Sequence, residues 1–178
     1  LLGADTGGAG VPLCKSFMHL HLGVRADTFP ENLPPQWTIV NSWDVPIDAP
    51  GNVIVVSVPS LLDPSLAPPG HHVIHAYTAG NEPYDVWERF ASEGGKRTAA
   101  DDDAYEALKA ERAAPMWEAI ERRVPRVREG CVVTQVGTPL THERFLRRHR
   151  GNYGLAIPAG NEGGLEFPKV CTPLPGFY

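Results

Sequence analysis

The sequence has few cysteines and no long apolar segment. Its three cysteines, Cys14, Cys131 and Cys171, are widely spaced and odd in number. They therefore indicate neither a disulfide framework nor a zinc site, and they favour a reducing compartment. No run approaches the roughly 18 consecutive apolar residues that a membrane-spanning helix requires. We therefore expect no transmembrane segment in this chain.

Positive charge is also scarce. The chain has 16 Lys and Arg residues against 21 Asp and Glu residues, a net charge of -5 and a pI near 5.8. Such a balance argues against general nucleic-acid binding, which needs a basic field, and we expect no nucleic-acid partner. The basic cluster formed by Arg144, Arg147, Arg148 and Arg150 is either a solvated helix face or a contact for an anionic membrane surface.

Common nucleotide and hydrolase motifs are missing as well. The glycines within residues 7–10 follow no apolar strand and precede no helical pattern, so they do not form a dinucleotide phosphate turn. Residues 94–97, Gly-Gly-Lys-Arg, lack the spacing of a phosphate loop and are interpreted as a linker. Ser57, Ser60 and Asp63 lack a Gly-x-Ser-x-Gly elbow, which argues against a hydrolase triad.

The 178 residues suffice for one domain with a proper core. Gly and Pro, 18 each, predict long loops. We expect an irregular Gly-rich lead-in over residues 1–15 and a single domain over residues 16–178.

Alternating apolar residues predict a strand over residues 16–24. Met18, Leu20, Leu22 and Val24 fall on one face, and the other face carries the intervening residues. Similar reasoning predicts strands over residues 37–41, 52–58, 71–78 and 131–136. The β-branched run 52–58 is the best candidate for a central strand, with 71–78 as its antiparallel neighbour.

Helices are predicted over residues 84–92, after the aspartates 101–103, and from Pro139 onward. The second should be kinked or split by Pro115, which breaks the hydrogen-bond ladder. Strands followed by grouped helices predict an α+β fold, with an antiparallel or mixed sheet and helices on one face. The other face of such a sheet is free.

Histidines cluster on two of the predicted strands. His19 and His21 lie two apart and share a face, and His71, His72 and His75 lie on another strand. Alternate strand residues can chelate a metal, but no carboxylate or cysteine accompanies them at ligand spacing. We interpret them as hydrogen-bonded or solvent-facing histidines and predict no metal site.

Residues 136–154 have the most distinctive pattern. Thr138 followed by Pro139 is a sensible helix start, because proline has no N–H to leave unpaired there. Gly151 and Gly154 flank Tyr153 and allow a tight turn or a close approach. Tyr153 is either a buried aromatic in that turn or a flat wall of a binding site.

Three separated motifs in this order resemble a known family. They are residues 137–145 (Gly-Thr-Pro-Leu-Thr-His-Glu-Arg-Phe) with 151–154 (Gly-Asn-Tyr-Gly), residues 16–24, and residues 60–72. The chain resembles the carotenoid isomerases and phytoene desaturase-like proteins, which are FAD-dependent amine-oxidase-like proteins. The resemblance runs from about residue 16 to the end and implies their substrate domain.

The resemblance implies a cis-trans isomerisation of a poly-cis carotenoid polyene, in which reduced flavin transiently changes the bond order without net oxidation. It gives no clear acid-base residue. Residues implied to face the flavin or the polyene are Thr138, Pro139, Arg144, Tyr153 and Gly154, with His19 and His21 as weaker candidates.

The flavin motifs that open and close such proteins are not present in this sequence, which begins at Leu1. We expect a portion of a larger protein or a shortened relative, catalytically incomplete and without FAD on its own. The alternative is a non-catalytic carotenoid-binding or scaffold subunit of a thylakoid photosynthetic complex. Either reading implies a plastid protein, peripheral to the thylakoid or envelope membrane.

Overall fold

A computed structural model describes residues 6–7, 11–91, 98–156 and 176 of the chain. By their contacts, the residues divide into two units, one of Lys15–Tyr153 and one of Leu1–Cys14 with Gly154–Tyr178. The predicted linker at residues 94–97 lies outside the described residues. The domain boundaries predicted from the sequence stay a prediction.

The smaller unit contains a short two-stranded sheet. Strand β1 (Thr6–Gly7) pairs antiparallel with β2 (Val11–Pro12). Leu13 forms an isolated antiparallel bridge with Leu155, and the Cys14 N–H donates to the Gly154 carbonyl.

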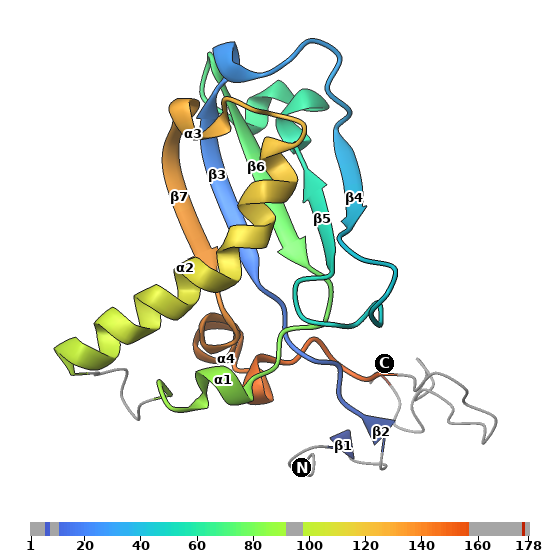
Figure 1. Ribbon diagram of the computed structural model, residues 1–178, viewed down its shortest axis with the longest axis vertical. Coiled ribbons are helices and arrows are strands. Elements are labelled where there is room, and N and C mark those ends of the chain that lie inside the picture. Colours follow the sequence, from blue (N-terminus) through green and yellow to red (C-terminus); the bar gives the residue numbers. More distant parts are fainter. Residues whose placement is uncertain (1–5, 8–10, 92–97, 157–175, 177–178) are drawn as a thin grey trace. The chain divides into compact units, whose positions relative to one another are not determined.

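The larger unit is built on a five-stranded sheet of order β4-β5-β6-β3-β7, in which every pair is antiparallel (Figure 1). The strands are β3 (His19–Arg25), β4 (Gln36–Val40), β5 (Val53–Ser57), β6 (His71–Thr78) and β7 (Cys131–Gly137). The five predicted strands and the α+β class are thus confirmed. β5 is interior as predicted, although β6 holds the middle position.

One face of the sheet forms the core. Alternation along β3 buries Leu20, Leu22 and Val24, whereas β6 contributes Ile74 and Ala76 to the same cluster. Each residue exposes at most about one hundredth of its surface, and a fully buried Leu or Ile side chain contributes about 1.5–3 kcal/mol.

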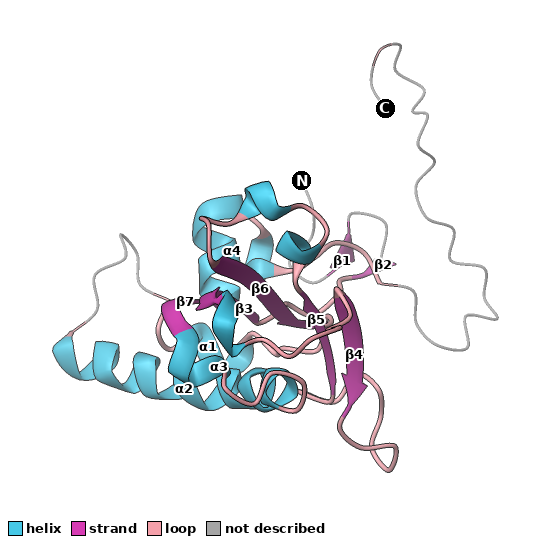
Figure 2. Cartoon of the chain, turned by 90° about the horizontal axis from the view of Figure 1, so that it is seen from above, coloured by secondary structure: helices cyan, strands magenta, loops and turns pink. Residues whose placement is uncertain are grey.

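Helix α2 (Ala99–Glu121) covers this apolar face (Figures 1 and 2). It is one helix that contains Pro115, so of the two predicted outcomes the division into two helices is wrong, whereas the kink stays a prediction. Ala113 and Met116, on either side of the proline, are buried in the core. We attribute the continuity of the helix to this burial, which outweighs the hydrogen bond that proline removes.

The shorter helices lie at the ends of strands. They are α1 (Asp85–Glu88), α3 (Val127–Gly130) and α4 (Pro139–Leu146), with 3-10 turns η1 (Ala26–Thr28), η2 (Pro59–Leu61), η3 (Pro64–Leu66) and η5 (His149–Gly151). Helix α1 is shorter than the predicted helix over 84–92, and α4 begins at the predicted Pro139. No helix among the described residues is long and apolar enough to cross a membrane.

The second face of the sheet carries polar and aromatic side chains. On β3 the residues that alternate with the buried leucines are His19, His21 and Gly23, and their partners on β6 are Tyr77, His75 and Val73. α4 flanks this face only near His19, where β7 ends. At the other end, residues 66–68 lie beside Gly23 and Val73. Between these two borders no described helix covers the expected free face, and the candidate site lies at its α4 end.

Candidate functional site

A capped helix closes one end of the free face. Thr138 is the N-cap of α4, and its side chain forms a capping box with Thr141. The Thr138 hydroxyl also shares a 2.9 Å hydrogen bond with the Tyr105 hydroxyl of α2. Because Thr138 is fully buried, its role is to fix the start of α4.

Gly151 holds the next turn against the same helix. Its φ is +59°, and a Cβ at this position would overlap the Pro139 carbonyl oxygen. Both facts require glycine, because L-residues rarely adopt this backbone conformation. The Gly151 carbonyl accepts a 2.7 Å hydrogen bond from the Ser16 hydroxyl, so Tyr153, two residues on, is placed against β3.

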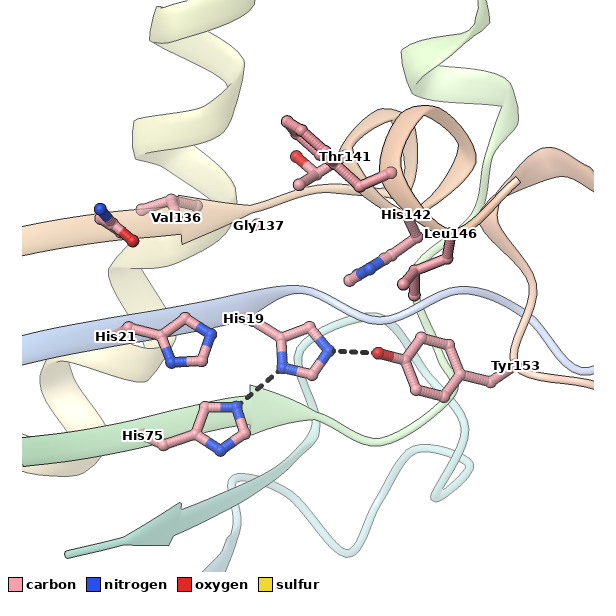
Figure 3. A pocket seen from close by; sticks show the side chains of 11 residues that line it. His19, His21, His75, Val136, Gly137, Thr141, His142, Leu146 and Tyr153 are labelled. Carbon is pink, nitrogen blue, oxygen red and sulfur yellow. Dashed lines mark hydrogen bonds between the residues drawn. The ribbon is translucent and has the colours of Figure 1, made fainter. Parts of the chain in front are cut away.

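Strands β3, β6 and β7, helix α4 and the turn that carries Tyr153 line an open pocket of about 440 Å³ (Figure 3). Within the described part of the chain, no Asp, Glu, Lys or Arg side chain lines it. Its lining residues are His19 and His21 of β3, His75 of β6, Gln135, Val136 and Gly137 of β7, Thr141, His142, Phe145 and Leu146 of α4, and Tyr153.

The centre of the pocket is a hydrogen-bonded chain of three side chains. His19 Nδ1 and His75 Nε2 share a hydrogen bond of 2.8 Å, and His19 Nε2 and the Tyr153 hydroxyl share one of 2.9 Å (Figure 3). The His21 ring stacks on the His75 ring, with centroids 4.4 Å apart and planes 2° from parallel.

A fourth imidazole approaches from α4. The His142 ring meets the His19 ring edge-on, with centroids 5.0 Å apart, and it interacts with the Phe17 backbone. Its Nε2 is buried and has no hydrogen-bond partner in the described part of the chain. Figure 3 shows this ring directed toward His19.

Burial keeps these imidazoles neutral. It lowers the pKa of His19 to about 3, with smaller contributions from the neighbouring His142, His75 and His21. Burial, and then the nearby His21, lowers the pKa of His75 to about 4. The pKa values of His21 and His142 are also lowered, again chiefly by burial. The pocket thus presents uncharged nitrogen atoms at neutral pH.

An aromatic wall borders the histidines. The Phe17 ring lies parallel to the Tyr153 ring, with centroids 4.0 Å apart and planes 3° from parallel. It is also parallel to the Tyr77 ring at 5.9 Å. The Phe17 and Tyr153 rings are therefore stacked face to face, which stabilises the position of Tyr153 beside the histidines.

The structure brings together three of the residues predicted to form the site, His19, His21 and Tyr153. Thr138 and Pro139 are buried at the start of α4 and do not line the pocket. Arg144 is exposed, with its guanidinium 5.1 Å from the Phe145 ring centroid, and does not line the pocket either.

Gly154 has a φ of +115° and belongs to the smaller unit. The assignment of all seven residues to a flavin or polyene site stays a prediction.

Two further histidines of this pocket, His75 and His142, are not among the residues predicted to form the site. The sequence places His75 in a second histidine cluster but not beside His21, because the pairing register that sets the two opposite each other cannot be read from alternation alone. His142 lies four residues after the cap Thr138. Its i, i+3 neighbour Phe145 on the same helix face was the available signal.

Comparison with known proteins gives one consistent group of relatives. No established family model matches the chain. The chloroplastic prolycopene isomerase of Arabidopsis thaliana is 32% identical over 165 residues, which make up 92% of this chain and 26% of that protein. Prolycopene isomerase 2 of an Oncidium hybrid cultivar is 32% identical over 164 residues, with the same shares of each chain.

The chloroplastic prolycopene isomerase of Daucus carota is 31% identical over 165 residues, 92% of this chain and 25% of its own. The chain spans about a quarter of the length of the curated relatives it matches. The resemblance found in the sequence motifs is thereby confirmed. This chain is therefore homologous, over nearly all of its length, to one region of the prolycopene isomerases.

Proposed function

We propose that this chain supplies part of the polyene-binding region of an FAD-dependent carotenoid cis-trans isomerase in the plastid. The observation that carries the proposal is the 32% identity to chloroplastic prolycopene isomerases over 92% of the chain. The polyene would lie along the free face of the sheet, against the aromatic wall of Phe17, Tyr77 and Tyr153.

The chemistry of the pocket supports an uncharged, flat ligand. Among the described residues it is lined by neutral imidazoles, aromatic rings, aliphatic groups and the uncharged polar Gln135 and Thr141, and by no ionised side chain. A conjugated polyene has no charge to pair, so burying a charged group beside it would cost free energy without compensation. Parallel aromatic rings offer such a ligand a large contact area at low entropic cost.

The pyrophosphate turn of an FAD site is not found in this sequence. Such a Gly-x-Gly-x-x-Gly turn is what places the pyrophosphate at a helix N-terminus. In our proposal the FAD is held by residues outside these 178, and this chain binds and orients the polyene. No step of the isomerisation is assigned to a side chain here.

The α4–η5 corner, residues 139–151, supports contact with a membrane, where such a polyene is stored. Phe145 and Leu146 expose 70% and 54% of their surface beside the pocket mouth, and Arg144, Arg147 and Arg148 are exposed around them. Exposed apolar side chains among cations suit an anionic lipid surface. Arg150 is less available, because it pairs with Asp85 and Glu88.

Polyene binding is tested by circular dichroism, because an achiral polyene acquires a signal in its visible absorption band only when it is bound in a chiral site. Prolycopene is delivered to the full chain from detergent micelles. We expect a saturable signal at one polyene per chain. Leu146→Glu, which places a charge at the pocket mouth, should weaken binding about tenfold, since a charge beside an apolar ligand costs at least 1–2 kcal/mol.

The matched control is Leu62→Glu, because Leu62 is also highly exposed and does not line the pocket. It should bind like the unmodified chain. Absence of an induced signal, or equal loss in both variants, would refute binding at this face. Binding is the property tested, so the result stands whether or not the chain alone isomerises the polyene.

A further inference from the structure

We propose that His19, His21 and His75 form a binding site for a divalent transition-metal ion such as Zn²⁺. This inference goes beyond the carotenoid function and does not depend on it, but it concerns the same pocket. A bound ion would place charge beside the polyene, so we expect the two ligands to compete. The expectation of no metal rested on the lack of a carboxylate or cysteine at ligand spacing that could serve as a further ligand beside the histidines. The antiparallel register supplies a third histidine instead, because His75 of β6 is the direct partner of His21 of β3.

The three side chains converge from two paired strands. His19 and His21 lie two residues apart on β3 and so project from the same face. Each of the three histidines offers a ring nitrogen, and these nitrogens all lie within 4.8 Å of one another. Two ligands from one strand and a third from its neighbour provide three corners of a tetrahedron, the arrangement of a metal site with three histidines.

Small side-chain movements would complete the geometry. With Zn–N bonds of about 2.0–2.1 Å, tetrahedral ligand nitrogens lie about 3.3 Å apart. The His19 Nδ1 to His75 Nε2 distance of 2.8 Å must therefore open slightly, and the wider pairs must close by about 1.5 Å at most. Rotation of the imidazoles about their side-chain bonds would provide both changes.

Tyr153 orients the His19 ring as a metal ligand. When its hydroxyl oxygen accepts the proton of His19 Nε2, at 2.9 Å, the Nδ1 atom keeps its lone pair for a metal. Such a contact to the far nitrogen of a histidine ligand fixes its tautomer and ring plane. The His75 proton then moves from Nε2 to Nδ1, a change of tautomer that frees the ligand nitrogen and releases no proton.

His142 gives an independent indication. It is more than nine-tenths buried, and its Nε2 has no hydrogen-bond partner among the described residues although the ring is directed at His19. Leaving a buried polar atom unpaired costs about 1–3 kcal/mol. A metal-bound water at the fourth position would give this nitrogen a partner, whereas the histidine hydrogen bonds alone leave it without one.

The ligand set selects the kind of ion. Imidazole nitrogens suit Zn²⁺, Cu²⁺, Ni²⁺ and Fe²⁺, whereas Mg²⁺ and Ca²⁺ require oxygen ligands. No carboxylate of the described residues lines the pocket. Three protein ligands leave one position open to the pocket, which is typical of ions that bind a water or another ligand rather than of closed structural sites.

The test is a titration of the full, chelator-treated chain with Zn²⁺ by calorimetry and with Co²⁺ by visible absorption. We expect one ion per chain and the intense Co²⁺ bands of tetrahedral coordination. His21→Gln and His75→Gln should each weaken binding at least about tenfold. Tyr153→Phe, which leaves all three ligands in place, should weaken it about tenfold as an orienting contact does.

The matched control is His71→Gln, because His71 lies on the same strand as His75 and does not belong to the cluster. It should bind like the unmodified chain, and far-ultraviolet circular dichroism checks that every variant is folded. No saturable binding, or equal binding by the His71 and His75 variants, would overturn the proposal. Because no polyene is added, failure here leaves the carotenoid proposal unaffected, and failure of polyene binding leaves this one unaffected.

Discussion

Glu82 is a buried carboxyl group outside the candidate site. It exposes 2% of its surface, accepts a 2.8 Å hydrogen bond from the Trp87 indole, and lies 3.7 Å from the Arg112 guanidinium. Burial raises its pKa despite these two partners, which favour the charged form. Between the ordinary and the raised pKa, the folded protein therefore holds a proton that the unfolded chain has lost.

The sign of the pH dependence follows from this difference. Because the folded state binds more protons in that window, the Glu82 contribution to the free energy of unfolding falls as pH rises through it. Glu82→Gln keeps an acceptor for Trp87 and cannot ionise. We expect its stability relative to the unmodified protein to increase as pH rises from about 4 upward.

Urea unfolding at several pH values measures this effect. Glu129→Gln is the control, because Glu129 is exposed and pairs only on the surface with Arg126. Parallel stability curves for the Glu82 variant and the unmodified protein would contradict the assigned direction of the pKa shift.

The turn η5 shows how one glycine positions a functional side chain. Gly151→Ala adds a methyl group that overlaps the Pro139 carbonyl and forces a positive φ on alanine. We expect a loss of about 1–3 kcal/mol in the free energy of unfolding. The hydrogen bond between Tyr153 and His19 should also be lost. NMR spectra would report this loss as changed chemical shifts of the His19 ring nitrogens.

Gly70→Ala separates the cost of a positive φ from the cost of the overlap with the Pro139 carbonyl. Gly70 also has a positive φ, +75°, but no described atom lies within 4 Å of the point that a Cβ would occupy there. It should cost about 1 kcal/mol from backbone strain alone and leave the His19 signals unchanged. Equal losses in the two variants would mean that the contact with α4 does not hold the turn.

For the secondary-structure elements, the sequence was most informative about which face of a strand is buried and where a helix begins. Alternation along residues 16–24 separated the buried leucines from His19 and His21, and the Thr138–Pro139 pair marked the beginning of α4. The antiparallel pairing of β5 with β6 was predicted and is confirmed. The place of β3 was not predictable, because it pairs with both β6 and β7, which follow it by about fifty and a hundred residues.

The candidate site was predictable only in part for the same reason. His19, His21 and Tyr153 come from segments with clear local patterns, whereas His75 enters the pocket through the register of a long-range pairing. The continuous α2 was also not predictable, because a proline is tolerated there through tertiary burial of its neighbours. Local sequence patterns thus identified several residues of the site, whereas long-range strand pairing determines which of them lie together.

At the scale of the whole molecule, we predict that the chain binds anionic membranes through the α4–η5 corner. We expect the chain to sediment with vesicles of phosphatidylglycerol and phosphatidylcholine and not with phosphatidylcholine alone. Arg147→Gln should lower the binding constant about fivefold, because each cation near such a surface contributes about 1 kcal/mol. Arg123→Gln, an exposed change just after the end of α2, should have no such effect.

Equal sedimentation with both kinds of vesicle would contradict electrostatic docking at this corner. Raising the salt concentration provides a further check, since the attraction should weaken as charges are screened.

The most direct test of the central claim is an exchange of homologous regions. This chain replaces the matching region of the Arabidopsis thaliana prolycopene isomerase, and conversion of prolycopene to its all-trans form is measured by chromatography. Flavin absorption of the purified chimera shows whether it is assembled. We predict that an assembled chimera keeps at least about a tenth of the parent rate, a loss of no more than about 1.4 kcal/mol. An assembled, flavin-containing chimera without conversion would contradict the claim that this chain binds the polyene for isomerisation.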